Sequence, residues 1–442
     1  VLAGLLTWLV LSRGVLGPLL PEHSRRFWFR ALAAVAFLAW WLPFGLGVRP
    51  EPFAALLLTA VFAAVLQAVQ QQRTAWLGVA VLAAGLAVSV NAMGITAIAP
   101  FIALAGPIRR MLSVPTAALL AGIGATGVVA MFADQSLAGT AAATRLHEHY
   151  GPDVPWFQEI LRYQYLLGFD SQGDVARRLP VLLTAVLAVH CGLVLLRGAN
   201  RLTAGHAHAA PVVFGLSLLL MALTPSKWTH YFGALAGIGA ATLVTSAVLV
   251  AVAARQLRSD RVVLVGGAVS AVLAALAAAL SFAGKNNWFL HSHYGVPWGE
   301  QPVRPLNNPL LWLVATGALL AISSAAGDFR RALVRAPAVV GTAAVAAGVL
   351  LVLFSFAIAP LRQSGSYSTA AQNLAALSGR GSCGIADHVV VTPDVPGGVL
   401  RPDGPAEAVG FDAGGGYAEA PPGGTEPDDD TMADRYLMAD EI

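Results

Sequence analysis

The chain has 442 residues, of which 57% are hydrophobic and only 12% are charged, and its mean hydropathy is +0.67. Soluble domains carry about 25% charged residues, so this composition excludes a soluble globular protein and predicts an integral membrane protein. The net charge of +3 includes only two lysines, and we expect no nucleic-acid partner. The two cysteines, Cys191 and Cys383, have neither a metal-binding spacing nor a disulfide framework.

Long apolar runs follow one another from residue 1 to residue 360. A transmembrane helix needs about 20 mostly apolar residues, and on that rule the sequence predicts about 12 spans, the first of which is cut short. The runs at 95–107 and 211–224 are short, which fits tilted or re-entrant segments or misplaced bounds. The predicted spans are 1–12, 29–48, 52–69, 75–93, 95–107, 114–133, 179–197, 211–224, 230–254, 262–283, 308–326 and 336–360.

Arginines gather in alternate loops, which predicts the orientation of the chain. Arginine and lysine favour cytoplasmic loops, so we expect the basic loops on the cytoplasmic side of the plasma membrane. The intervening loops, including 134–178 and 284–307, and the C-terminus are then outside. The basic loops contain Arg25, Arg26, Arg30, Arg73, Arg109, Arg110, Arg201, Arg255, Arg258, Arg261, Arg330, Arg331 and Arg335.

Residues 361–442 differ from the rest of the chain. Their apolar runs have the length of strands, as in "HVVVTPDV" (388–395), and Gly, Pro and Asp become frequent. This predicts the beginning of an exterior β-rich domain, and the acidic end of the chain is expected to be disordered.

A short polar segment, "TPSKWTHYFG" (224–233), interrupts two apolar runs. Thr224 is a typical N-cap and Pro225 a typical first helical residue, so we expect a helix from Pro225 to Ala254 that begins on the outer side. The N-terminus of a helix carries partial positive charge and free N–H groups.

Four side chains near this predicted helix start suit an anionic ligand. Lys227, His230 and Tyr231 would share a helix face at spacings of three and four residues, and Trp228 adds a second aromatic ring. A lipid phosphate at the membrane surface is the ligand we expect. The alternative is a lysine reaching the interface among belt aromatics.

The other lysine lies in the predicted exterior loop "GKNNWFLHSHYGVPWGEQPVRP" (284–305). Trp288 and Trp298 alternate with polar residues there, which favours stacking on a sugar. The pair His291 and His293 lacks a third ligand at convincing spacing, so we expect no metal. A plain structured loop is the alternative.

The predicted exterior loop 134–178 contains "WFQEILRYQYLLGF" (156–169), whose apolar spacing predicts an amphipathic helix on the outer surface. Gln135, Gln158 and Arg162 are candidates for lining a polar cleft. A solvated structural role is the alternative for each of them.

Segments along nearly the whole chain to about residue 400 resemble the mycobacterial-type arabinosyltransferases of the Emb family, the ethambutol targets. They occur in the family's order: "LAGLLTWLVLSR", "WLPFGLGVRPEP", "DQSLA", "PWFQEILRYQYLLGF", "LTPSKWTHYFG", "YGVPW", "RQSGSYSTAAQNLAALSG" and "SCGIADHVVV".

The resemblance implies an all-α polytopic glycosyltransferase of the GT-C type. Such an enzyme transfers arabinofuranose from decaprenylphosphoryl-arabinose to cell-wall arabinan, as arabinogalactan or lipoarabinomannan, outside the membrane, and works as a homo- or heterodimer. The sequence identifies no cofactor. Trp228 and His230 match family pocket residues that meet donor and drug. Gly47, Gln135 and Gln158 lie in segments that line or flank the same cleft.

The chain also departs from the family pattern. Family members have about fifteen spans, and their catalytic Asp precedes the region where this sequence begins, so the resemblance implies a fragment that is inactive alone, with no catalytic residue of its own. Most of the C-terminal carbohydrate-binding domain is also absent. A transporter of polyprenyl lipid or sugar, and a non-catalytic subunit that binds lipid or glycan, remain alternatives.

Overall fold

The computed structural model describes residues 2–45, 49–133, 136–150, 154–198, 206–286, 295–362 and 377–379. Two compact units divide the chain: Val1–Ala133 with Pro152–Val389, and Asp134–Gly151 with Val390–Ile442. The second unit contributes one described helix, α9 (Leu137–Tyr150). The predicted β-rich domain over 361–442 lies almost entirely outside the described residues.

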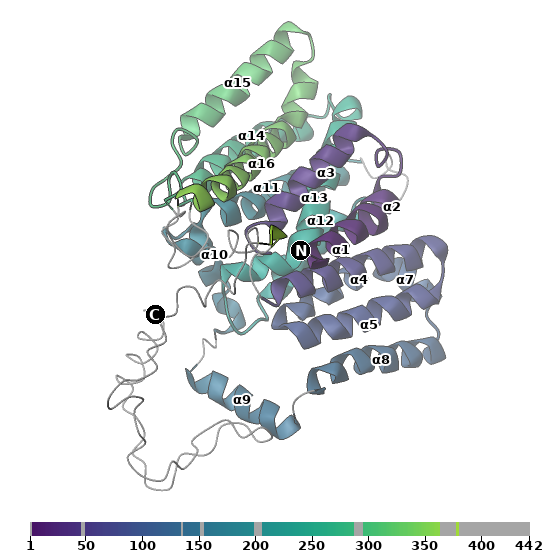
Figure 1. Cartoon of the computed structure of the whole chain (residues 1–442). Helices are drawn as coiled ribbons and strands as arrows, with labels where there is room; N and C mark the ends of the chain where they lie inside the picture. The colour runs from purple at the N-terminus through teal and green to yellow at the C-terminus, as the bar shows by residue number, and fades with distance from the viewer. Residues whose placement is uncertain are drawn as a thin grey trace, which may run out of the picture. The chain divides into compact units, whose positions relative to one another are not determined.

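Every regular element in the described residues of the first unit is a helix (Figure 1). Its α-helices are α1 (Leu2–Leu9), α2 (Gly17–Leu19), α3 (Phe27–Trp41), α4 (Glu51–Gln71), α5 (Thr74–Val90), α6 (Ala99–Ala103), α7 (Ala105–Met111), α8 (Val114–Val129), α10 (Ile160–Leu167), α11 (Val175–Leu196), α12 (Ala209–Met221), α13 (Ala236–Gln256), α14 (Arg261–Phe282), α15 (Pro309–Ala325) and α16 (Phe329–Arg362). Short 3-10 or π segments are η1 (Val10–Leu16), η2 (Ala92–Ile98), η3 (Ala130–Phe132), η4 (Trp156–Gln158), η5 (Ser171–Gly173) and η7 (Thr229–Leu235).

Each of the twelve predicted apolar runs falls on one or more of these helices. Within the described residues, seven helices are long and apolar enough to cross a membrane, and an eighth span is possible if the bent pair Ala92–Ala103 and Ala105–Met111 crosses as one. That pair is bent by 77°, at one of the two runs whose shortness suggested a re-entrant segment. Four shorter apolar helices account for the remaining runs. An all-α polytopic membrane fold is therefore confirmed, and the count of about twelve spans stays a prediction.

Helix α13 forms the centre of the first unit. It packs against α3, α4, α11, α12 and α16, with α4, α5 and α8 side by side on one flank and α14, α15 and α16 on the other (Figure 1). Most of its residues are buried, and its many Gly, Ala and Thr residues explain why. Small side chains let membrane helices approach closely, because lipid is as apolar as the helix surface and association depends on packing.

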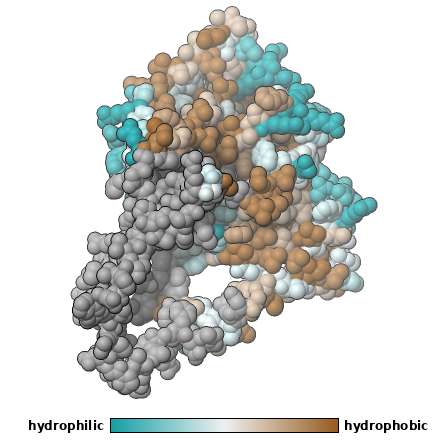
Figure 2. Space-filling view, viewed as in Figure 1, coloured by the Kyte–Doolittle hydropathy of each residue, from teal (hydrophilic) through white to brown (hydrophobic). Residues whose placement is uncertain are grey.

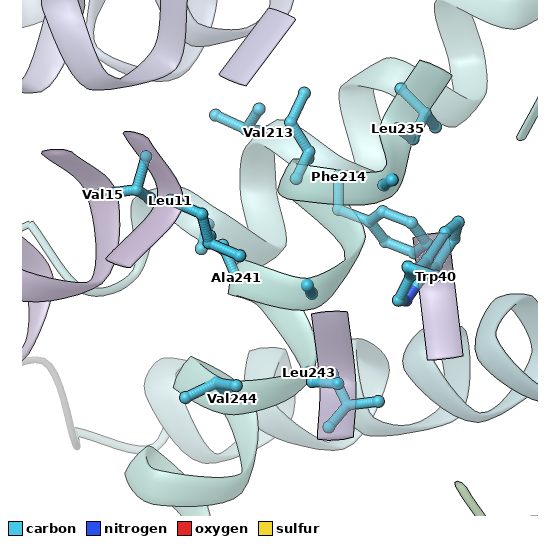
Figure 3. Packing of buried hydrophobic residues seen from close by; sticks show 14 of the residues in the cluster. Leu11, Val15, Trp40, Val213, Phe214, Leu235, Ala241, Leu243 and Val244 are labelled. Carbon is cyan, nitrogen blue, oxygen red and sulfur yellow. The ribbon is translucent and has the colours of Figure 1, made fainter. Parts of the chain in front are cut away.

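Aromatic residues lock neighbouring helices onto α13. The rings of Trp40 in α3 and Phe214 in α12 meet edge to face, with 5.8 Å between centroids, and Figure 3 shows them turned toward each other. The indole N–H of Trp40 donates to Thr184 Oγ1 in α11 at 3.1 Å. This buried bond satisfies the indole, which membrane interiors cannot do with water.

Apolar side chains also cover much of the outside of the first unit. Figure 2 shows hydrophobic residues across the face, with hydrophilic residues gathered toward its margins. On α14, α15 and α16, for example, Val265, Val314 and Leu350 are each more than 60% exposed. Soluble proteins rarely expose apolar surface on this scale, so these side chains face lipid.

Candidate functional site

The helix predicted from Pro225 begins later than the sequence indicates. The regular helix α13 starts at Ala236, and the seven residues before it form the tighter 3-10 segment η7. Thr224 is not an N-cap, because its hydroxyl bonds the carbonyls of Met221 at 2.8 Å and Ser226 at 3.1 Å and so closes a turn after α12. We call residues 221–232, from the last residue of α12 into the first half of η7, the Lys227 corner.

The side chain of Lys227 is fully buried inside this corner. Its ammonium group donates to the carbonyls of Ala222 at 2.8 Å and Thr224 at 2.7 Å, and lies 3.5 Å from Glu159 Oε2. A buried cation needs such partners because desolvation is costly. The geometry therefore gives Lys227 a structural role, and a contact with phosphate would require the ammonium group to leave these partners.

Arg162, in the separate helix α10, binds several groups of the Lys227 corner. Its side chain is fully buried, and it donates to both carboxylate oxygens of Glu159, at 2.6 and 3.2 Å. The planar fork of a guanidinium group suits several acceptors at once. At 2.8–3.2 Å it also reaches the hydroxyl of Thr224 and the carbonyls of Met221, Ser226 and Trp228. Arg162 was expected to line a cleft, but its side chain is buried and its hydrogen bonds hold the residues of the corner together.

A second buried arginine holds the other end of α10. Arg178, near the start of α11, donates to the carbonyls of Leu166, Leu167 and Gly168 at 2.8 Å. The last carbonyls of a helix lack partners within it, so the guanidinium group caps α10. The helix predicted over 156–169 is thus present as η4 and α10. Its place on an outer membrane surface stays a prediction.

Four aromatic rings form a row at the corner. Tyr165 and Trp228 are stacked with centroids 6.1 Å apart, Trp228 and His230 are stacked at 6.3 Å, and Tyr231 meets the edge of His230 at 5.0 Å. Trp228 and Tyr165 are both 38% exposed, so part of the row is open to a ligand. The faces of such rings suit the C–H surface of a sugar.

His230 also faces a buried acid. Its Nε2 lies 3.5 Å from Oε1 of Glu51, the first residue of α4, and Glu51 is only 2% exposed. Glycine at position 233 permits this approach: a Cβ there would lie 2.5 Å from the Cβ of Phe44 and 3.3 Å from that of Glu51.

Positive charge surrounds the histidine ring. The guanidinium groups of Arg49, Arg162 and Arg177 all act electrostatically on His230, and Arg49 and Arg177 act on Glu51 as well. Arg177 reaches the corner directly, since its Nη1 lies 3.4 Å from Thr229 Oγ1. The corner is therefore cationic even with Lys227 buried.

Asp174 ties Arg177 to the start of α11. It caps the helix by accepting from the backbone N–H of Arg177 at 2.8 Å, and its Oδ2 lies 3.4 Å from Arg177 Nε. Burial raises the pKa of Asp174 from 3.8 to about 7, although Arg177 and Arg178 act in the opposite direction.

Only some of the remaining predicted site residues lie within the described part of the chain. Gly47, Gln135 and Trp288 lie outside the described residues, as do His291 and His293. Gln158 is exposed in η4. Trp298 is half-buried against the core, and its carbonyl accepts from the backbone N–H of Asn286 at 2.9 Å. Lys285 pairs with Glu300 at 2.7 Å. Across the part of the chain that the structure describes, no cluster of three or more His, Cys, Asp or Glu residues could hold a metal ion.

Sequence reasoning places Arg49 and Glu51 at the membrane interface, with a site-lining role only as the alternative, and it missed Tyr165 and Arg177 as members of this site. Glu51 carried a signal, because a carboxylate directly before an apolar run stands at a membrane boundary. Tyr165 and Arg177 carried none, since both lie more than 50 positions from His230 and only folding brings them near.

Comparison with known proteins supplies the family. Residues 1–330 match the family described as "Mycobacterial cell wall arabinan synthesis protein", and residues 353–421 match the "EmbC C-terminal domain". The chain belongs to this arabinan synthesis family. The likeness expected from the sequence motifs is thereby confirmed.

Individual relatives agree with the family match. The chain is 33% identical over 433 residues to probable arabinosyltransferase B of Mycobacterium avium, which covers 91% of this chain and 39% of the relative. It is 33% identical over 429 residues to probable arabinosyltransferase C of Mycolicibacterium smegmatis, again covering 91% and 39%. The chain thus spans about two fifths of the length of these relatives.

A solved structure shares the fold. The cryo-EM structure of arabinosyltransferase EmbB from Mycobacterium smegmatis superposes with a TM-score of 0.66 at 26% identity, covering 86% of this chain and 35% of that one. This likeness confirms the expected GT-C-type fold.

Proposed function

We propose that the protein acts in the transfer of arabinofuranose from decaprenylphosphoryl-arabinose to cell-wall arabinan. Membership of the arabinan synthesis family and the names of the relatives support this reaction. The observation that carries it is the Lys227 corner, where an exposed aromatic row lies beside several cations at one end of a membrane bundle.

Each part of a lipid-linked sugar has a counterpart near this corner. Arg49 and Arg177 supply positive charge for the phosphate, and arginine suits phosphate because its N–H groups match the oxygens in pairs. Trp228 and Tyr165 offer the exposed parts of their rings to the sugar, and Tyr231 closes the row beside His230. The phosphate contact first expected of Lys227 passes in this proposal to the two arginines.

A small apolar pocket lies near the start of α11, and the polyprenyl chain is proposed to pass over it rather than to fill it. It lies between α3, α11 and α16 and is lined only by apolar residues and one glycine, including Pro43, Ala176 and Val349. Ala176 immediately precedes Arg177, so the pocket begins next to the proposed phosphate site. An isoprenoid tail there would extend along the lipid-facing helices.

The chemistry follows from the charges that change during transfer. An acceptor hydroxyl attacks the anomeric carbon, a carboxylate takes the proton as general base, and the polyprenyl phosphate departs with an added negative charge. Fixed cations beside the leaving phosphate stabilise that charge as it develops. Arg49 and Arg177 are the groups we assign to this task, and we assign the general base to no described residue.

The corner is proposed to face the outside of the plasma membrane, because the arginine-rich loops belong to the opposite ends of the helices. The C-terminus would then also be outside. The acceptor would be arabinan of arabinogalactan or lipoarabinomannan, and a family paralogue or a second copy would complete a dimer.

Binding of the lipid-linked donor tests this function directly. We would measure the Kd of polyprenylphosphoryl-arabinose for the protein in lipid nanodiscs, comparing the parent with Trp228→Ala. Loss of the ring should weaken binding about twofold to tenfold, since aromatic contacts contribute around 0.5–1.5 kcal/mol. Trp28→Ala is the control, because Trp28 is similarly exposed, at 46%, near the start of α3.

Two results would contradict or narrow the proposal. If the parent binds no donor, or if Trp28→Ala weakens binding as much as Trp228→Ala, the corner is not the donor site. Donor binding together with no transfer to an arabinan acceptor would instead indicate the non-catalytic lipid-binding subunit.

A further inference from the structure

Glu51 is a buried acid that the proposed chemistry leaves unused. Its Oε1 lies 3.5 Å from His230 Nε2, while Oε2 is buried and has no hydrogen-bond partner. An unpaired carboxylate oxygen in a buried site is costly, so its retention beside the site calls for a role. Glu51 begins α4, which packs closely against η7 through Gly233.

Three neighbours fix the ring of His230. Trp228 stacks on one face with an interplanar angle of 16°, Tyr231 stands at 90° to it, and Glu51 faces Nε2. Glu51 Oε1 lies 3.5 Å from Nε2 without a formed hydrogen bond, and because a carboxylate only accepts hydrogen bonds, we place the ring proton on Nε2. The bond made by one ring nitrogen sets the role of the other, and Nδ1 is left to meet a ligand.

The chemistry around the ring favours a hydroxyl as that ligand. A phosphate at His230 would lie near the buried negative charge of Glu51 and be repelled, whereas Arg49 and Arg177 offer cations for it. A sugar hydroxyl is uncharged and both donates and accepts, so it can bond Nδ1 without that repulsion. The aromatic row already offers the sugar a ring face beside this nitrogen.

We propose that Glu51 is a positioning residue that holds His230 with Nε2 turned inward, so that Nδ1 recognises a hydroxyl of the donor sugar rather than its phosphate. This inference rests on the proposed function. It separates the recognition of the two halves of the donor: arginines for the phosphate, and the Glu51–His230 pair for the sugar.

Two lipids that differ only in the sugar provide the test. We would measure Kd in nanodiscs for polyprenyl phosphate and for polyprenylphosphoryl-arabinose. Glu51→Ala should weaken binding of the sugar lipid about tenfold, the effect of one lost ligand hydrogen bond, and change binding of polyprenyl phosphate less than about twofold. Arg177→Gln should weaken both.

Conservative replacements separate positioning from support of the fold. Glu51→Gln keeps an acceptor for Nε2–H and should restore most of the sugar-lipid affinity. His230→Asn places its amide near the position of Nδ1 and His230→Gln near that of Nε2, so Asn should bind the sugar lipid better. If Glu51 acts through His230, Glu51→Ala combined with His230→Gln should be no weaker than His230→Gln alone.

Thr59→Ala is the matched control. Thr59 is buried in α4 two turns from Glu51, and its hydroxyl bonds the carbonyl of Ala55 in the same helix. This variant should bind both lipids like the parent. If it loses the sugar lipid as Glu51→Ala does, packing of α4 is responsible and the positioning role is overturned.

The outcomes also distinguish this inference from the proposed function. Equal losses for both lipids in Glu51→Ala and Glu51→Gln would show that the pair serves the phosphate, and unchanged binding in both would show that it serves neither. Either result overturns the inference while leaving the donor site in place. Failure of the parent to bind both lipids would overturn the proposed function as well.

Discussion

At the scale of single residues, two buried cationic side chains largely determine the conformation of the Lys227 corner. Arg162 binds an acid, a hydroxyl and three carbonyls with one guanidinium group, and Lys227 shares the same acid, Glu159. Backbone carbonyls that lie outside a regular helix need other hydrogen-bond donors where water is excluded. The two cations supply those partners, which is why an irregular segment can stand between two apolar helices.

Replacement of Arg162 should therefore destabilise the protein. Arg162→Ala is expected to lower the free energy of unfolding by about 3 kcal/mol, because breaking a buried charged pair typically costs about 3–5 kcal/mol. The lower end of that range applies because Glu159 still has Lys227 as a partner. Thermal unfolding in detergent measures the change. Arg197→Ala is the control: Arg197 is 48% exposed in its 3.0 Å pair with Asp260, and exposed pairs contribute little to stability. Equal effects of the two variants would contradict the role of Arg162.

Asp174 should make stability depend on pH. Its pKa is about 7 in the folded protein against 3.8 ordinarily, so the folded state keeps the proton that the unfolded chain releases. Stability is then greatest below about pH 4 with respect to this group and falls as pH rises toward 7, by a few kcal/mol at most, since one pKa unit corresponds to about 1.4 kcal/mol.

Unfolding midpoints between pH 4.5 and 8 would measure this dependence. Asp174→Asn keeps a capping side chain but cannot ionise, so its midpoint should change less with pH than that of the parent. Identical pH profiles for parent and variant would show that Asp174 does not carry the dependence.

At the scale of elements, glycines decide how closely the helices around α13 approach. Gly239 lies against the indole of Trp40, and a Cβ at this position would overlap the ring. The ring cannot move freely, because it also packs on Phe214 and bonds Thr184. The absence of a side chain at one position thus sets the spacing of three helices.

Gly239→Ala should consequently destabilise the bundle by about 1–3 kcal/mol, the usual cost of overpacking a core. Gly215→Ala in α12 is the matched control, since a Cβ there meets no atom within 4 Å and alanine favours a helix by about 0.5–1 kcal/mol. Opposite shifts in unfolding temperature are expected, and a stabilised Gly239→Ala would contradict this packing.

At the scale of the whole molecule, the proposed function depends on which ends of the helices face outward. Helix α14 is a single 22-residue apolar helix between a basic loop and the segment that follows residue 284. We therefore expect its two ends to lie on opposite sides of the membrane. The orientation decides whether the Lys227 corner meets a periplasmic or a cytoplasmic substrate.

Cysteine labelling can settle that orientation. A membrane-impermeant maleimide should label Gln301→Cys in intact cells and Arg258→Cys only after permeabilisation, in a background without the two native cysteines. Both positions are exposed. The reverse pattern would place the corner in the cytoplasm, and labelling of both in intact cells would show that α14 does not span.

The location of the helices and the family of this protein could be predicted from the sequence alone. Apolar runs of membrane length located the helices, because a lipid environment requires long apolar segments whose backbone groups bond internally, and the motifs pointed to the family. The tertiary structure decided what composition does not encode: that Lys227 is buried while Trp228 stays open, and that α13 begins at Ala236. It also decided that Glu51 lies beside His230 and that Arg177 reaches Thr229. Those outcomes depend on contacts between residues far apart in the chain, where burial and charge pairing, rather than local pattern, select the geometry.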